Sequence, residues 1–249
     1  MSALLAQVEI RERTEDTCVA DNGFCPDWIV DNFDRYVDPF LEHVVLTVVA
    51  VAIGFGIAFS LALFAYRRRW LIDPVTQITG ILYTIPSIAA FFLLLPITGR
   101  GFTTATVALV AYVLLIIFRN VLAGLDNVPG DIKDAGRGMG LTDRQLLWRV
   151  EVPLALPEIM AGLRIAATTT VGLATLVFFA GAGGLGEQIF ADITFKSNVV
   201  VAGGLAVLLA AALDGLILLV QRAITPWETA SLRSRPSRLL ARRRAAVAR

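Results

Sequence analysis

Long apolar segments alternate with short polar ones along most of this 249-residue chain. A helix needs about 20 residues to cross a hydrocarbon core of about 30 Å, and several of the apolar segments reach that length. Backbone polar groups cannot stay unpaired in lipid, so each segment is predicted to be a helix, and no strand is expected. The pattern predicts an all-α membrane protein with five spans, at Val44–Tyr66, Pro74–Thr98, Thr103–Leu125, Pro157–Ala180 and Val199–Val220.

The composition agrees with a membrane location. Hydrophobic residues make up 56% of the chain, charged residues only 17%, and the mean hydropathy is +0.70. A soluble domain carries about a quarter charged residues, so the surplus apolar surface is expected to face lipid. The formal net charge is only +1, so the chain lacks the overall basic charge typical of nucleic-acid binding, and no nucleic-acid partner is expected.

The basic residues are distributed unevenly between the two sides of the predicted spans. If the N-terminus lies outside, fifteen Lys and Arg residues face the cytoplasm and five face the exterior. Cytoplasmic segments of membrane proteins carry an excess of these residues. The charge pattern therefore predicts an N-out, C-in topology, and it places the polar loop of residues 128–156 in the cytoplasm.

This topology divides the chain into three regions. Residues 1–42 hold ten acidic residues against three basic ones and are expected to form an extracytoplasmic acidic cap. Residues 43–225 form the predicted transmembrane domain, and residues 226–249 form a basic cytoplasmic tail that is attracted to anionic membrane lipids. Apolar residues at helical spacing predict an amphipathic helix within the cap; they are Trp28, Ile29, Phe33, Val37 and Phe40.

The only two cysteines, Cys18 and Cys25, both lie in the cap. An oxidising compartment outside the cytoplasm would let them form a disulfide, and two free thiols are the alternative. No metal site is expected, because the single histidine, His43, cannot supply a set of ligands.

The polar loop has small residues at positions 135, 136, 138 and 140, with charged residues around them. A short helix with such a face is suited to docking into a groove on a partner protein. The loop resembles the EAA signature of bacterial ABC importer permeases, which reads Glu-Ala-Ala, three residues, Gly, nine residues, then Ile-x-Leu-Pro. The spacing is kept, and the signature positions are filled by Asp134, Ala135, Gly136, Gly140, Val150, Val152 and Pro153.

Further stretches resemble the glycine betaine/carnitine/choline permeases of osmoprotectant uptake. The resemblance covers about residues 42–225. The stretches are Thr84-Ile85-Pro86-Ser87, Leu95-Pro96-Ile97-Thr98-Gly99, Arg119-Asn120, Gly136-Arg137-Gly138-Met139-Gly140, Pro153-Leu154-Ala155-Leu156-Pro157 and Gly181-Ala182-Gly183-Gly184-Leu185-Gly186.

The resemblance implies the fold of a type I ABC importer permease in a bacterial cell membrane. Two permease subunits, identical or paralogous, would form the pathway, a cytoplasmic ABC ATPase dimer would drive it, and an extracytoplasmic binding protein would deliver the solute. The chain itself would be no enzyme and hold no cofactor, because the partner subunit binds and hydrolyses ATP. Coupling to that partner would fall to Asp134, Ala135, Gly136, Arg137, Gly140 and Pro153.

Several residues within the spans are candidates for lining the pathway. Pro86 and Pro96 are expected to interrupt the second span, because proline removes a backbone donor. Tyr83 and Tyr112 are the favoured aromatic residues, since a ring face can bind a quaternary ammonium group. Phe91, Phe92, Phe178 and Phe179 are further candidates of the same kind.

Asp214 is a carboxylate deep within the fifth span, where a charge is costly unless it faces protein or water. A structural ion pair with Arg119 or Arg164 is favoured over contact with solute. Glycines 181, 183 and 186 match a dinucleotide fingerprint, but they follow a membrane span, so a tight turn at the pathway mouth is expected instead.

Other functions stay open at this stage. An ABC permease for another small solute, such as an amino acid, taurine or nitrate, would carry the same coupling loop. An ion-gradient transporter is disfavoured, because it would show several intramembrane carboxylates and internal repeats. An intramembrane enzyme is disfavoured by the lack of clustered His, Cys or paired acids in the spans.

Overall fold

The computed structural model describes residues 17–227, and in this part of the chain every regular element is a helix, which confirms the all-α prediction. The long helices are α3 (Val37–Arg67), α4 (Ile72–Thr84), α5 (Ser87–Thr98), α6 (Phe102–Asp126), α9 (Val152–Ala174) and α11 (Lys196–Ile224). The short helices are α1 (Thr17–Ala20), α2 (Pro26–Asp31), α7 (Gly130–Gly138), α8 (Asp143–Leu146) and α10 (Leu185–Ala191).

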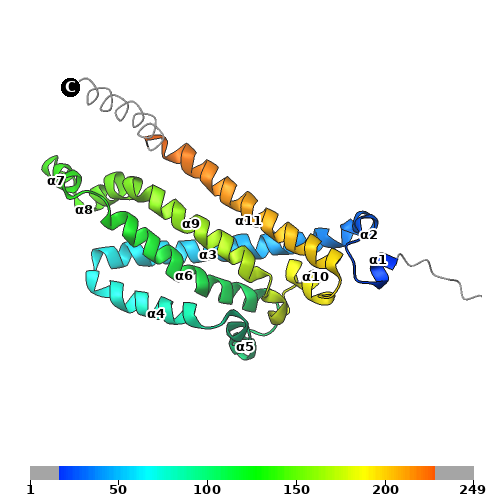
Figure 1. Ribbon diagram of the computed structural model, residues 1–249. Coiled ribbons are helices and arrows are strands. Elements are labelled where there is room, and N and C mark those ends of the chain that lie inside the picture. Colours follow the sequence, from blue (N-terminus) through cyan, green and yellow to red (C-terminus); the bar gives the residue numbers. More distant parts are fainter. Residues whose placement is uncertain (1–16, 228–249) are drawn as a thin grey trace, which may run out of the picture.

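The long helices form a bundle around α6, which packs against both α3 and α9, while α11 packs on α9. Small residues permit close approach: a Cβ added to Gly162 on α9 would lie 2.4 Å from the Cβ of Asn120 on α6. Figure 1 shows α7 and α8 at one end of the bundle and α1, α2 and α10 at the other. We call these the loop end and the cap end.

The number of membrane-crossing helices differs from the prediction. Three helices of the described part are long and apolar enough to cross a membrane, namely α3, α6 and α11, and the bent pair of α4 and α5 makes a fourth if it is counted as one span. Helix α9 is more polar, because it carries Glu158, Arg164 and three consecutive threonines. The predicted count of five is therefore not confirmed, although the apolar segments fall where the pattern put them.

The second predicted span is two helices joined at a sharp bend. Helices α4 and α5 meet at an angle of 99°, and the break falls at Ile85 and Pro86, whose backbones are extended. Proline restricts the residue before it to extended conformations, which ends α4. Pro96, by contrast, lies inside α5 without ending it. Of the two prolines, only Pro86 therefore interrupts the helix of the second predicted span.

The predicted amphipathic helix of the cap is divided. Helix α2 ends at Asp31, and Asn32 turns the chain into a 3-10 turn, Phe33–Tyr36, that leads directly into α3. The Asn32 side chain donates to the carbonyl of Trp28 at 2.9 Å. The Asn32 backbone N–H donates to the same carbonyl at 3.0 Å, and the helix ends because Asn32 has φ of −115° and ψ of +16°, outside the helical range. Residues 1–16 of the predicted cap and 228–249 of the predicted tail lie outside the described residues.

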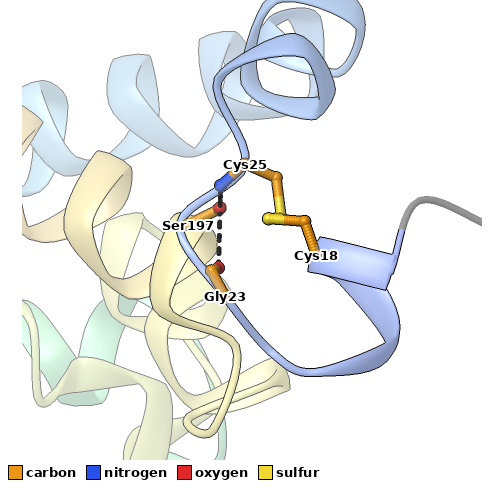
Figure 2. The surroundings of a disulfide bond; sticks show 4 residues. All are labelled: Cys18, Gly23, Cys25 and Ser197. Carbon is orange, nitrogen blue, oxygen red and sulfur yellow. Dashed lines mark hydrogen bonds between the residues drawn. A yellow bond between two sulfur atoms is a disulfide. The ribbon is translucent and has the colours of Figure 1, made fainter.

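The cap is tied to the beginning of α11. Cys18 and Cys25 are joined by a disulfide, as Figure 2 shows, and the Cys25 backbone N–H donates to Ser197 Oγ at 2.7 Å. Ser197 in turn donates to the carbonyl of Gly23 at 3.1 Å. The Tyr36 hydroxyl donates to Asn198 Oδ1 at 2.8 Å. Cys25, Tyr36, Ser197 and Asn198 are buried, so the described part of the cap packs on the bundle end.

Candidate coupling and translocation sites

The polar loop folds into two short helices and a wide turn at the loop end. Helix α7 ends near Gly138, and Gly140 has φ of +83°, a conformation that favours glycine. Helix α8 then starts with a capping box: Gln145 N–H donates to Thr142 Oγ1, and Thr142 N–H donates to Gln145 Oε1 at 2.9 Å. The signature therefore forms a compact helical hairpin.

Buried and half-buried contacts hold α7 against the bundle. Lys133 Nζ donates to the Tyr66 hydroxyl at 3.0 Å and to the Leu125 carbonyl at 3.1 Å, which connects α7 to the ends of α3 and α6. Arg69 pairs with Asp126 at 2.7 Å beside the same tyrosine. Lys133 was visible in the sequence only as a flanking charge; its anchoring role depends on the fold.

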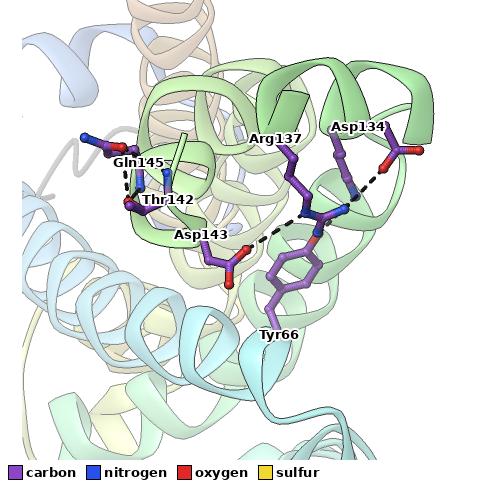
Figure 3. Close-up of polar contacts among 7 residues, drawn as sticks. Tyr66, Asp134, Arg137, Thr142, Asp143 and Gln145 are labelled. Atoms are coloured by element: carbon purple, nitrogen blue, oxygen red, sulfur yellow. Dashed lines mark hydrogen bonds and ion pairs between the residues drawn. The ribbon is translucent and has the colours of Figure 1, made fainter. Parts of the chain in front are cut away.

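Arg137 lies between two carboxylates on the outer side of the loop. Its distances are 3.3 Å to Asp134 and 3.9 Å to Asp143, and Figure 3 shows it pointing between them. All three side chains are more than half exposed, so these pairs contribute little to stability. They leave charged groups available to a partner.

The small residues of the signature do not share one exposed face. Ala135, Gly138 and Gly140 are exposed, but Gly136 is buried, and a Cβ added there would lie 2.6 Å from Leu146 Cδ1. Gly136 thus lets α7 fold onto α8 rather than onto a partner. Met139, 76% exposed, adds an apolar group to the free surface of the hairpin. Pro153 is half-buried in the first turn of α9, where proline fits a helix.

The Tyr83 and Tyr112 rings lie edge to face with centroids 6.0 Å apart. Tyr112 is buried, and its hydroxyl donates to the Ile85 carbonyl at the break before Pro86. Tyr112 thus satisfies a carbonyl at the helix bend and stabilises the bend.

Asp214 on α11 and Arg164 on α9 form a two-bonded ion pair, with Nε–Oδ1 and Nη2–Oδ2 distances of 2.7 and 2.8 Å. Arg119, the other partner considered, is exposed on α6. This geometry agrees with a structural ion pair rather than with a contact to the solute, because the planar guanidinium donates to both oxygens of the carboxylate.

Two cavities open at the cap end, on either side of the glycine-rich turn. One, of about 590 Å³, is lined by Leu41, Glu42, Val45, Leu46, Phe102, Gly181, Ala182, Gly183 and Glu187. The other, of about 440 Å³, is lined by Phe92, Arg100, Phe178, Phe179, Gly181, Gly183 and Glu187. We call the second one the aromatic cavity. Arg100 and Glu187 were not recognised as site residues from the sequence, since they lie 87 positions apart and only the fold brings them to one cavity.

The glycine-rich turn has no strand beside it in the described structure. Gly181, Gly183 and Gly184 all have positive φ, from +62° to +80°, and the turn leads from a 3-10 helix, Val177–Ala180, into α10. This is the tight turn that the sequence predicts at this position, in place of a nucleotide-binding unit.

These features define a class: a multi-pass helical membrane protein with a short helical hairpin, α7 and α8, between its long apolar helices. Comparison with known proteins identifies the family. Residues 50–226 match the family described as "Binding-protein-dependent transport system inner membrane component". This chain belongs to that family, the membrane permeases of ABC importers, which work with an ATPase and a substrate-binding protein. It is a multi-pass protein of the bacterial inner membrane.

Curated relatives and solved structures agree on this family. The osmoprotectant import permease protein OsmW of Salmonella typhimurium is 36% identical over 206 residues, covering 80% of this chain and 96% of the relative. The glycine betaine/carnitine/choline transport system permease protein OpuCB of Bacillus subtilis is 34% identical, covering 74% and 86%. A chain of the MetNI methionine ABC transporter, in an inward-facing conformation, has a TM-score of 0.66 at 26% identity and covers 76% and 96%.

Proposed function

We propose that this chain is the permease subunit of an ATP-driven importer for compatible solutes such as glycine betaine, choline, carnitine or proline betaine. The observation that carries the proposal is the similarity, over most of both chains, to permeases named for osmoprotectants, choline and carnitine. The chain itself acts without covalent chemistry, and a partner ATPase binds and hydrolyses ATP.

The loop end supports a coupling role for the signature. Its exposed charges and Ala135 form the free surface, while Lys133 fixes α7 to the ends of α3 and α6. A force applied to α7 by an ATPase would therefore reach two long helices directly. We assign docking to Asp134, Ala135, Arg137 and Gly140, and the support of the hairpin to Gly136 and Pro153.

We propose further that two permease subunits assemble with an ATPase dimer, and that a binding protein docks at the cap end. Translocation then follows the bent pair of α4 and α5, where Tyr83, Pro86 and Tyr112 lie together. Asp214 holds α11 to α9 through Arg164 and has no direct role with the solute.

The test is reconstitution of the complete transporter in vesicles, with ATP and the binding protein. Uptake of labelled glycine betaine, choline, carnitine and proline is measured beside methionine, because a methionine transporter is a structural relative. Uptake that needs ATP and is saturated by quaternary ammonium solutes is expected. Uptake of methionine alone, or uptake by the isolated chain without ATP, would contradict the proposal.

A further inference from the structure

The aromatic cavity combines phenyl rings with two charges of opposite sign. Phe178 and Phe179 lie with ring centroids 5.5 Å apart, and Phe92 approaches Phe179 at 6.4 Å. Phe190 supports them from α10, at 5.5 Å from Phe178 and 5.1 Å from Phe179. The rings come from three separate segments, so the cluster exists only in the folded bundle.

Arg100 and Glu187 line this cavity without pairing with each other. Among residues 17–227, no ion pair involves either side chain. Their backbones are held in place independently: Gly101 N–H donates to the Ala180 carbonyl at 2.8 Å beside Arg100, and Glu187 lies in α10. Unpaired charges of opposite sign around one cavity are the complement of a ligand that carries both charges.

We propose that the aromatic cavity binds a zwitterion with a quaternary ammonium group and a carboxylate, a proposal that rests on the proposed function. The ammonium group lies against the phenyl rings and the Glu187 carboxylate, since ring faces and anions both attract such a cation. The carboxylate of the solute meets the Arg100 guanidinium, whose geometry suits two parallel hydrogen bonds. A volume of about 440 Å³ holds a small solute of this kind.

The two other candidate places fit such a solute less well. The larger cavity at the cap end is lined by two carboxylates, Glu42 and Glu187, by one aromatic ring and by no basic residue. It offers nothing to the solute carboxylate. The Tyr83 and Tyr112 pair has only two rings, and the Tyr112 hydroxyl is already used by the Ile85 carbonyl.

The experiment uses a cysteine reporter in the membrane complex of permease and ATPase subunits, and the binding protein is left out. Only sites in the membrane complex can then respond. The chain has two cysteines and both are in the disulfide, so an added thiol is the one that reacts in this chain. Ala182→Cys places it on the lining of the larger cavity, between Gly181 and Gly183, which line both cavities, with a small change of side chain. Ala191→Cys is the matched control, because Ala191 is exposed at the end of α10 and lines neither cavity.

Glycine betaine is expected to slow labelling of Ala182→Cys by an impermeant thiol reagent and to leave Ala191→Cys unchanged. Choline, which has no carboxylate, should protect at higher concentration. Arg100→Gln should weaken protection by glycine betaine by at least about tenfold while leaving choline unchanged, because it removes a hydrogen-bonded charge from the carboxylate alone.

Aromatic variants separate the ring faces from simple packing. Phe92→Leu should weaken protection by both solutes by about 3- to 30-fold, and Phe92→Trp should restore it. Phe64→Leu is the matched control, because Phe64 on α3 is exposed to the same degree, 53% against 52% for Phe92, and lies outside the cavity.

The outcomes distinguish the site from the proposed function. Import of glycine betaine without protection of Ala182→Cys, at concentrations that saturate import, would overturn the site and leave the function standing. Equal loss of protection for both solutes in Arg100→Gln would overturn the assignment of a zwitterion. Protection without any import of quaternary ammonium solutes would contradict the function and support the site.

Discussion

Gly186 is the position where the structure predicts the sharpest effect of a single methyl group. A Cβ added there would lie 1.8 Å from the carbonyl oxygen of Thr175 and 2.6 Å from its carbonyl carbon. Ordinary contact begins at 3.4 Å, so Gly186→Ala requires α10 and the end of α9 to separate by up to about 1.6 Å. The obstacle is backbone, which cannot rotate aside as a side chain can. Gly186 has no positive φ, so the effect is steric alone.

Forced overpacking of this kind costs about 1–3 kcal/mol. In a chain of this size, one kcal/mol shifts the unfolding midpoint by about 2–4 °C. Gly186→Ala is therefore expected to lower the midpoint of the purified transporter by about 2–12 °C, measured at one fixed scan rate. Because Glu187 is the next residue, the displacement should also weaken protection at the aromatic cavity.

Gly215→Ala on α11 is the control, because nothing lies within 4 Å of the Cβ it adds. Alanine is the better helix former by about 0.5–1 kcal/mol, so this variant should melt at the same temperature or slightly higher. The reasoning about close approach would be refuted if the two variants melted alike.

Three further predictions concern the two ends of the bundle. Ala135→Trp on the exposed surface of α7 should reduce co-purification of the ATPase by more than about tenfold, with normal amounts of permease in the membrane. Cys18 and Cys25 should be recovered as one linked pair of peptides from a non-reducing digest, and reduction should separate them. Ala191→Cys should react with an impermeant thiol reagent from outside the cell, and Gln145→Cys should not, as the distribution of basic residues requires.

Each of these has its own control. Ala20→Trp makes the same exchange at an exposed position at the opposite end, and loss of ATPase in both variants would contradict a docking role for α7. The digest must cut before Asp21, because trypsin leaves both cysteines between Arg13 and Arg35 in one peptide. Alkylation of both thiols without reduction, or reversed labelling of the two reporters, would count against the disulfide and the topology respectively.

Much of the candidate coupling site could be predicted from the sequence, because the signature and the helix start lie within one short segment of the chain. The spacing from Asp134 to Pro153 is a property of the sequence and does not depend on how the surrounding helices pack. Thr142 and Gln145 form a capping box, which specifies a helix start within four residues. Gly136 shows what the local sequence could not reveal. Its small size suggested a partner surface, but the neighbour that needs the space is Leu146 of the same hairpin.

The cap illustrates a different limit. Apolar spacing from Trp28 to Phe40 favours one helix, but the non-helical backbone of Asn32 divides it. The burial of Ser197, which bonds both Cys25 and Gly23, then decides that the cap packs on α11. A hydrophobic pattern does not reveal which polar atoms meet across 172 residues of chain.

By itself, the sequence determined the helical class, the positions of the apolar segments, the family signature in the polar loop and the residues able to pair with Asp214. These properties follow from the composition of each segment and from the spacing of its apolar residues, which can be read one helix at a time. The tertiary structure decided the 99° bend before Pro86, the choice of Arg164 over Arg119, and the meeting of Arg100, Glu187 and the phenyl rings in one cavity. Those features depend on how separate helices pack, because each needs groups from distant segments within a few ångströms of one another.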